Sequence, residues 1–230
     1  MRILAADTAT AYNTVALVDD GGLLAETVVR AGRRHSERLV ATVDWVLSEA
    51  GCALKDVDLL AISIGPGSFT GLRVGASAWK GLALAANLPL IGVPTLAAMT
   101  RVTAFSDEIV VPLLDARMSE VFGAVFSFVA GHRSRLTEDR VCPVSSILEN
   151  VPPGAAFFGD GAELYRAAIT QRVDRARFLP PEFNAPRAGA VAAEARELFA
   201  AGAIADPDAI APVYLRDSQP EEARKAVSGP

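Results

Sequence analysis

The sequence predicts an α/β protein in which mixed sheets are flanked by helices. Three observations lead to this class. The chain opens with three short apolar segments separated by turns, which is typical of an antiparallel meander. Helical and strand-like segments then alternate along the chain. The second half repeats the opening order of a strand ending in aspartate, a second strand and a glycine turn, with Asp115 in the place of Asp7, which indicates an internal duplication.

The first half supplies most of the regular elements. Glycine turns, apolar runs and helix-capping residues set their limits. The expected strands span residues 2–7, 14–18, 23–30, 59–64 and 90–93, and the expected helices span residues 36–50, 72–86 and 95–103, the last capped by Thr95.

The second half is less regular and is interrupted by proline pairs. Its expected strands span residues 109–114, 120–129 and 213–215, and its expected helices span residues 161–172 and 188–201. The sequence favours a division into domains 1–105 and 106–216, followed by a polar, mobile tail over 217–230.

Composition limits the classes of function. The chain has 230 residues, 51% of them hydrophobic, and a net charge of −5 from 22 basic and 27 acidic residues. Tight binding of nucleic acid by the chain alone is not expected, because contact with phosphates requires a positive surface. No apolar stretch is long enough to span a bilayer and no export signal is recognised, so we expect a cytoplasmic protein without a membrane partner.

Residues suited to metal binding or nucleophilic catalysis are scarce. The histidines are His35 and His132, and the two cysteines, Cys52 and Cys142, are far apart. The chain has neither an H-x-x-x-H nor an H-E-x-x-H pair, and it has no G-x-S-x-G elbow. We therefore predict no resident metal, and the two histidines leave few candidates for a catalytic triad assembled by the fold.

The most informative segment is the glycine-rich loop between the strand at 59–64 and the helix at 72–86. Backbone N–H groups at such a junction form an anion cradle. The candidate nucleotide or phosphate residues are Asp7, Thr8, Gly65, Pro66, Gly67, Ser68, Thr70 and Gly71. The glycine spacing fits neither a Walker A loop nor a dinucleotide fingerprint. A tight turn that packs the helix close to the sheet, with Asp7 in an Asx turn, is an equally open interpretation.

Two helices of the first half indicate a contact surface. In the helix at 36–50, Trp45 lies opposite the apolar face, beside Arg38, Thr42 and Glu49. The helix at 72–86 carries no charges except Arg73 and Lys80, so we expect it to be buried on two sides. The sheet covers one side, and either the second domain or another subunit covers the other. Tryptophan, small residues and an isolated arginine favour a subunit interface.

Taken together, five segments resemble the TsaB (YeaZ) family: residues 3–10, 35–39, 65–75, 113–117 and 212–216. The resemblance implies two subdomains of the actin-like ATPase (ASKHA, RNase H-like) fold. It also implies a non-catalytic subunit that binds and activates its paralogue TsaD. TsaD transfers a threonylcarbamoyl group to the adenosine beside the anticodon of tRNA, and the pair forms the platform for the ATPase TsaE.

The resemblance further implies which residues meet the partner. In that family the two N-terminal helices pack against their counterparts in TsaD. The corresponding residues here are Arg38, Thr42, Trp45, Glu49, Arg73, Val74, Ala78, Gly81, Leu82 and Ala85. The same surface is implied to form a homodimer when TsaD is absent. tRNA would be reached through the complex, no cofactor would be tightly bound, and ATP or ADP would lie only at the interface of the complex.

One departure from the wider family bears on chemistry. TsaD holds its metal with an H-x-x-x-H pair, and the matching positions here are Thr95 and Met99. Neither side chain replaces an imidazole ligand. Two other functions remain as alternatives. One is a stand-alone metallopeptidase, as the older family name glycoprotease suggests. The other is a small ATPase or kinase that uses Asp7, Thr8 and the glycine loop.

Overall fold

Two sheets with equivalent strand order organise the chain. The computed structural model describes residues 1–31, 35–103, 108–203 and 205–216. The first sheet has the order β3-β2-β1-β4-β5. Its strands are β1 (Ile3–Asp7), β2 (Tyr12–Asp19), β3 (Gly22–Arg30), β4 (Leu59–Gly65) and β5 (Leu90–Pro94). Strands β1, β2 and β3 are antiparallel, and β1, β4 and β5 are parallel, so the predicted meander and mixed sheet are confirmed.

The second sheet repeats this arrangement. Its main path is β10-β7-β6-β11-β12, again with antiparallel pairs on one side and parallel pairs on the other. These strands are β6 (Ile109–Arg117), β7 (Glu120–Gly123), β10 (Arg140–Cys142), β11 (Ala156–Phe158) and β12 (Arg177–Phe178), and β8 (Phe126–Val129) and β9 (His132–Arg135) extend from β6 as an arm. The duplication that the sequence predicts is therefore visible in the strand order.

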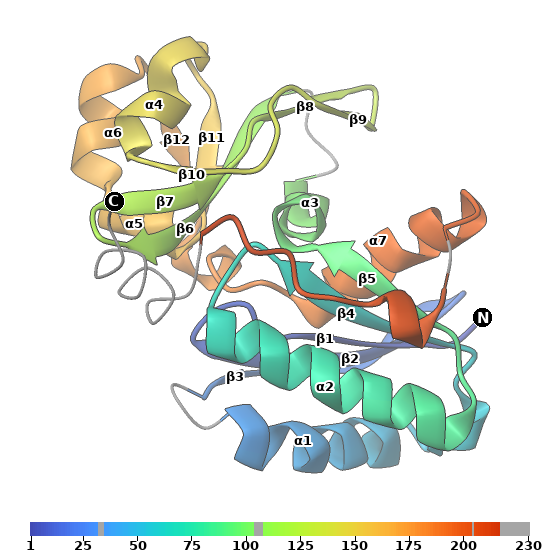
Figure 1. Ribbon diagram of the computed structural model, residues 1–230. Coiled ribbons are helices and arrows are strands. Elements are labelled where there is room, and N and C mark those ends of the chain that lie inside the picture. The colour runs from blue at the N-terminus through green and yellow to red at the C-terminus, as the bar shows by residue number, and fades with distance from the viewer. Residues whose placement is uncertain (32–34, 104–107, 204, 217–230) are drawn as a thin grey trace, which may run out of the picture.

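Helices cover both faces of the first sheet (Figure 1). The helices α1 (His35–Glu49) and α2 (Phe69–Ala86) lie side by side on one face, and α3 (Thr95–Met99) and α7 (Ala188–Ala200) lie on the other. Because side chains alternate along a strand, Leu4 and Ala6 pack under α1 and α2, while Ile3 and Ala5 pack against α7. Both faces of β1 are thus buried, as its continuous apolar run requires.

The domain division differs from the linear one that the sequence favours. Helix α7 comes late in the chain but packs on β1 and β2 of the first sheet. Residues 188–200 therefore belong spatially to the first lobe rather than with the rest of 106–216. The boundary at 105/106 and the tail at 217–230 lie outside the described residues.

Several element limits also differ from the predictions. The single strand expected over 120–129 is two strands, β7 and β8, because the chain bends at Val125, whose carbonyl accepts the backbone N–H groups of Leu136 and Thr137. The helix expected over 161–172 is divided at Tyr165 into α5 (Asp160–Leu164) and α6 (Arg166–Arg172). Residues 213–215, which the structure describes, form no strand.

Two smaller differences concern helix starts. Helix α2 begins three residues earlier than expected, at Phe69, because Ser68 is its N-cap. Thr95 does not cap α3: the N-cap is Pro94, and the Thr95 hydroxyl has no hydrogen-bond partner among the described residues.

The two lobes are joined through α3 and α7. Leu96 and Met99 of α3 pack with Phe126 and Phe158 of the second sheet in one apolar cluster. Glu194 of α7 is buried and accepts hydrogen bonds from Arg133 of β9. The second lobe also holds α4 (Val144–Ile147), which packs against α6. Within the described ranges, no helix combines the length and the apolar character needed to cross a bilayer.

Candidate functional site

The glycine loop lies where β4 ends and α2 begins, at the carboxyl edge of the first sheet. Ser68 forms the N-cap of α2, and its hydroxyl accepts the backbone N–H of Gly71 at 3.3 Å. The backbone N–H of Ser68 donates to the carbonyl of Ala9 at 2.7 Å. Two of the amides that a phosphate would need are therefore already bonded within the chain.

The hairpin between β1 and β2 fills the space over this loop. The Thr8 hydroxyl donates to the carbonyl of Gly71 at 2.8 Å. A Cβ atom at Gly71 would lie 2.0 Å from the carbonyl oxygen of Thr8, and one at Gly67 would lie 2.5 Å from that of Ala9. The glycines thus permit a close approach of two backbones. These contacts support the tight-turn interpretation; whether the loop also takes a nucleotide stays a prediction.

Asp7 is fully buried at the end of β1. Its Oδ1 accepts the backbone N–H of Ala9 at 2.9 Å, which is the expected Asx turn. Its Oδ2 has no hydrogen-bond partner within the described part of the chain, and neither has the hydroxyl of Ser63 on the adjacent strand. Burial raises the pKa of Asp7 to about 6, and the nearby Ser63 hydroxyl and the Ala9 amide lower it by less. A buried carboxyl group without a cation repels a phosphate.

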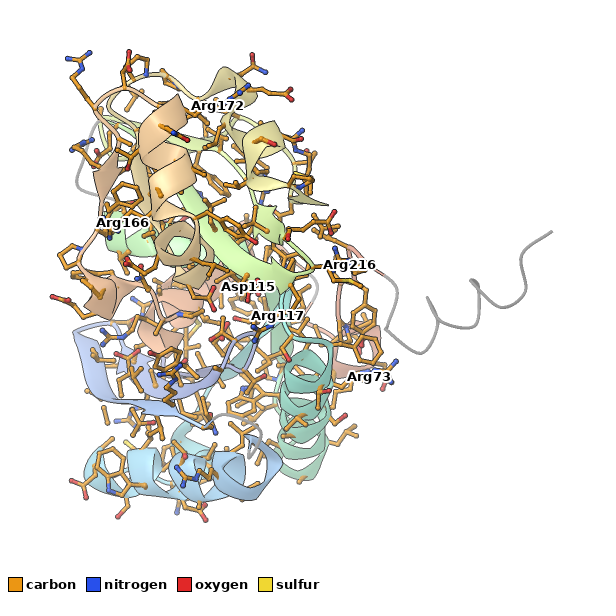
Figure 2. All side chains as sticks on the ribbon, turned by 90° about the vertical axis from the view of Figure 1, so that its left-hand side faces the viewer. Arg73, Asp115, Arg117, Arg166, Arg172 and Arg216 are labelled. Carbon is orange, nitrogen blue, oxygen red and sulfur yellow. The ribbon has the colours of Figure 1, made fainter. Side chains whose placement is uncertain are left out.

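The equivalent position in the second lobe is more open. Asp115 and Arg117 form an ion pair, with 2.9 Å between Oδ2 and Nη1. Asp160, at the start of α5, accepts the backbone N–H of Asp115 at 2.9 Å. Burial raises the pKa of Asp160, and the charge of Asp115 adds to that effect. Figure 2 shows Asp115 and Arg117 together near the junction of the lobes, with Arg216 beside them.

Thr95 and Met99 are the residues that the resemblance matches to the metal-binding histidines of TsaD. Both side chains are buried. Met99 belongs to the apolar cluster that joins the lobes. Across the described residues, no group of three or more His, Cys, Asp or Glu side chains is placed to hold a metal ion. The residues present here do not fit the metal of the paralogue.

The predicted partner-contact residues divide into two sets. Val74, Ala78 and Leu82 are partly buried and pack against the core beneath the helices, and Thr42 is also partly buried. The remaining predicted residues are exposed: Arg38, Trp45, Glu49, Arg73, Gly81 and Ala85. Trp45 is 50% exposed to solvent. The place of either set in an interface stays a prediction.

Two exposed residues of α2 are absent from the predicted contact set. Ser77 is exposed, and Leu84 is 69% exposed. At 100° per residue, Arg73, Ser77, Gly81 and Leu84 lie within about 80° of one another, so counting forward from Arg73 could have found both. We call the exposed set the outer helix face; it comprises Arg38, Trp45, Glu49, Arg73, Ser77, Gly81, Leu84 and Ala85.

The duplicated sheets and the two joined lobes define the class: the protein has the actin-like ATPase fold. One structural neighbour of this class is the ethanolamine utilization protein EutJ from Carboxydothermus hydrogenoformans. It has a TM-score of 0.54 and 14% identity, covering 84% of this chain and 89% of that chain, which shows the fold alone.

Closer similarity identifies the family. A family model described as "TsaD: tRNA N6-adenosine threonylcarbamoyltransferase" matches residues 19–224. The structure of YeaZ from Pseudomonas aeruginosa has a TM-score of 0.78 and 29% identity, covering 93% of this chain and 99% of that chain. The chain therefore belongs to the TsaB (YeaZ) group of the TsaD family.

Two curated relatives are both called tRNA threonylcarbamoyladenosine biosynthesis protein TsaB. The Bacillus subtilis protein is 26% identical over 226 residues, which is 96% of each chain. The Escherichia coli protein is 43% identical over 128 residues. That aligned segment spans only 55% of this chain and 55% of the relative, so the high identity applies to about half of each protein.

Proposed function

We propose that the protein is a non-catalytic subunit of tRNA threonylcarbamoyladenosine biosynthesis that acts by binding TsaD through the outer helix face. The names of the E. coli and B. subtilis relatives support the pathway, and the family model supports kinship with the transferase. The observation that carries the mechanism is the exposed, nearly uncharged stripe on α2, which the second lobe does not cover.

The shape of this stripe supports docking of another helix. Ser77, Gly81 and Ala85 are spaced four residues apart and are all exposed. A Cβ at Gly81 would meet no atom within 4 Å. Small residues at this spacing allow the backbones of two helices to approach closely, and Leu84 and Trp45 supply apolar surface on either side. In the proposed complex, this contact orders the TsaD active site and builds the surface on which TsaE and tRNA assemble in the cytoplasm.

The interior supports the non-catalytic part of the proposal. Asp7 is sealed under its own hairpin, and the glycine loop is occupied by Thr8 and Ala9. Thr95 and Met99 lie in packed interior. In this proposal nucleotide binds only at the interface with TsaD. The same outer helix face forms a homodimer when TsaD is missing.

The interface is tested by Gly81→Leu. A Cβ at this exposed position would meet no described atom within 4 Å, and leucine replaces a poor helix former, so the fold should remain as stable as the wild type. It would occupy the space of an approaching helix, and we expect association with purified TsaD to weaken by about 100-fold, from lost close packing. Calorimetry measures the affinity, and Ala193→Leu on the exposed side of α7 is the matched control.

Two further variants address the same face. Trp45→Glu should also lose TsaD with the fold intact. Ser77→Arg serves the purpose better than Ala78→Arg, because Ser77 is exposed whereas Ala78 packs against the core. Normal association of TsaD with all three variants would overturn the interface.

Reconstitution of threonylcarbamoyl transfer to tRNA tests the function itself. With TsaD and TsaE present, we expect modification to require this chain. One equivalent of tightly bound zinc or iron with peptidase activity would favour the metallopeptidase instead. Micromolar ATP binding with turnover by the isolated chain would favour an ATPase or kinase.

A further inference from the structure

We propose that Arg73 is the charged anchor of the outer helix face. In this proposal its guanidinium forms a bidentate ion pair with an aspartate or glutamate of the TsaD subunit, and Tyr214 of the C-terminal segment is the positioning residue that holds Arg73 for it. The inference rests on the proposed function, and it adds the chemical nature of the contact and the reason for its specificity.

The guanidinium of Arg73 is held in place before any partner arrives. Its carbon Cζ lies 3.9 Å from the centroid of the Phe69 ring, one turn earlier on α2. Its Nε donates to the Tyr214 hydroxyl at 3.0 Å, and the rings of Phe69 and Tyr214 lie 4.6 Å apart. A stacked and hydrogen-bonded arginine has lost much of its rotational freedom, so less conformational entropy is lost when it binds.

The charge of Arg73 is not neutralised within the described part of the chain. Several other arginines are paired with carboxylates; Arg101 and Arg133 contact Glu194, and Arg187 contacts Glu26. Arg73 instead contacts two aromatic residues, and no described carboxylate lies within 4.0 Å of its nitrogens. Among the residues that the structure describes, none takes its two terminal nitrogens, which form a fork on a face whose other α2 residues are Ser77, Gly81, Leu84 and Ala85.

A protein carboxylate fits this fork better than a phosphate. Two parallel N–H groups of a planar guanidinium match the two oxygens of a carboxylate. Phosphate sites usually combine several cations or amides, and the other cation of α2, Lys80, lies to one side with its Nζ 3.5 Å from the carbonyl of Asp208. An arginine beside a stripe of small and apolar residues matches the enrichment of arginine in binding hot spots between proteins.

The C-terminal segment is held by hydrogen bonds on both sides of Tyr214 in the chain. Its Val213 N–H donates to the carbonyl of Ile64 at 2.7 Å, just before the glycine loop. Arg216 donates to the carbonyl of Ala116 in the second lobe at 2.9 Å. Between these points the segment passes from the first lobe to the second (Figure 1), and Figure 2 shows Arg73 and Arg216 on the same side of the molecule. The second lobe is thereby mechanically connected to the proposed anchor.

The test measures the Kd of the full chain for TsaD as a function of NaCl concentration. Arg73→Ala should weaken binding by about 30-fold or more, because the partner carboxylate is left without its cation. Arg73→Lys retains the charge but loses the fork and the ring stacking, and should weaken binding by about 10-fold. Tyr214→Phe retains the ring but removes the hydrogen bond to Nε, and should weaken binding by about threefold. Arg172→Ala, at an exposed arginine on α6, is the matched control and should bind as the wild type does.

Salt dependence separates an ion pair from a packing effect. The Kd of the wild type should rise with NaCl, and the Kd of Arg73→Ala should depend on it much less. Scanning the acidic residues of TsaD would identify the partner carboxylate. Replacing that residue by lysine should restore binding to the Arg73→Glu variant of this chain. If the wild type binds TsaD and the Kd of Arg73→Ala lies within about twofold of the wild-type Kd, this inference alone is overturned. Failure of the wild type to bind TsaD at all would overturn the proposed function and the inference with it.

Discussion

The ends of β1 and β6 are equivalent places in the two lobes, yet their aspartates have different surroundings. Asp7 is fully buried and has one oxygen without a partner among the described residues. Asp115 is paired with Arg117, whose side chain is 81% exposed. The hairpin after Asp7 is covered by the glycine loop, whereas the hairpin after Asp115 reaches solvent.

The position of the glycines explains this difference. In the first lobe Gly67 and Gly71 contact Thr8 and Ala9, which follow Asp7 in the chain. In the second lobe Gly159 contacts Leu113, which precedes Asp115. Close packing beyond the aspartate buries it fully, and close packing before the aspartate leaves it partly exposed. Duplication of a strand order therefore does not duplicate the chemistry at the end of the strand.

Removing the seal of the first lobe should have the largest effect. In Gly71→Ala the new Cβ would lie 2.0 Å from the Thr8 carbonyl oxygen, and both sides of the contact are backbone. We expect a loss of about 4 kcal/mol or more in the free energy of unfolding. Urea denaturation measures it, with Gly81→Ala as the control in the same helix. A stable Gly71→Ala protein would show that the loop is not closed on the hairpin.

Neutralising the buried aspartate should have the next largest effect and should depend on pH. The pKa of Asp7 is raised from 3.8 to about 6, so the folded state favours its protonated form. The protonated Asp7 carboxyl contributes its full stabilisation of the folded state below about pH 4, and this contribution is lost as the pH rises through 6. At pH 8 we therefore expect Asp7→Asn to be more stable than the wild type by about 3 kcal/mol.

The measurement is the difference in unfolding free energy between Asp7→Asn and the wild type from pH 4 to pH 8. The difference should be near zero at the acidic end, should grow between about pH 4 and pH 6, and should level off above that. A difference that stays constant across this range would show that Asp7 ionises as it does in water.

Releasing the hairpin of the second lobe should have a smaller effect. Arg216 donates to the Ala116 carbonyl and pairs with Glu120, on either side of a tip in which Arg117, Met118 and Ser119 all have positive φ. Arg216→Ala removes contacts that hold this strained tip, and we expect a loss of about 1–2 kcal/mol. Limited proteolysis should show faster cleavage near Met118. An unchanged cleavage rate and unchanged stability would mean that the hairpin keeps its conformation without Arg216.

Altering the open aspartate should have the smallest effect. Asp115→Asn retains the acceptor for the backbone N–H of Arg117, and it removes both an ion pair with an exposed arginine and the repulsion of Asp160, which act in opposite directions. We expect a change below about 0.5 kcal/mol in urea denaturation at pH 8. A change as large as that of Asp7→Asn would abolish the distinction between the two lobes.

Much of the fold could be predicted because its signals are local. The meander over β1, β2 and β3 and helices α1 and α7 follow from apolar periodicity and from turn residues. The ion pair of Asp115 and Arg117 was also predictable, because its partners are two residues apart. The break at Val125 was not, because the cause is a hydrogen bond from Leu136, eleven residues later.

The exposure of the candidate contact residues was predicted in part. Helical spacing placed Trp45 on the outside of α1, and the structure confirms its exposure. Val74, Ala78 and Leu82 came from the family resemblance instead, and they are partly buried against the core, whereas the exposed Leu84 was not predicted. An apolar helix has no polar stripe to mark its orientation, so only its packing on the sheet and on α1 shows which residues point outward.

The amino-acid sequence by itself determined the class of fold, the family and the absence of paired histidines, because residue identity and spacing carry these directly. Tertiary structure decided which lobe holds α7, that Asp7 is sealed, and that Arg73 and Tyr214 meet. Those facts depend on contacts between residues more than 60 positions apart, such as Thr8 with Gly71 and Arg73 with Tyr214. Such contacts form only when the whole chain packs, since no local signal in either segment encodes its distant partner.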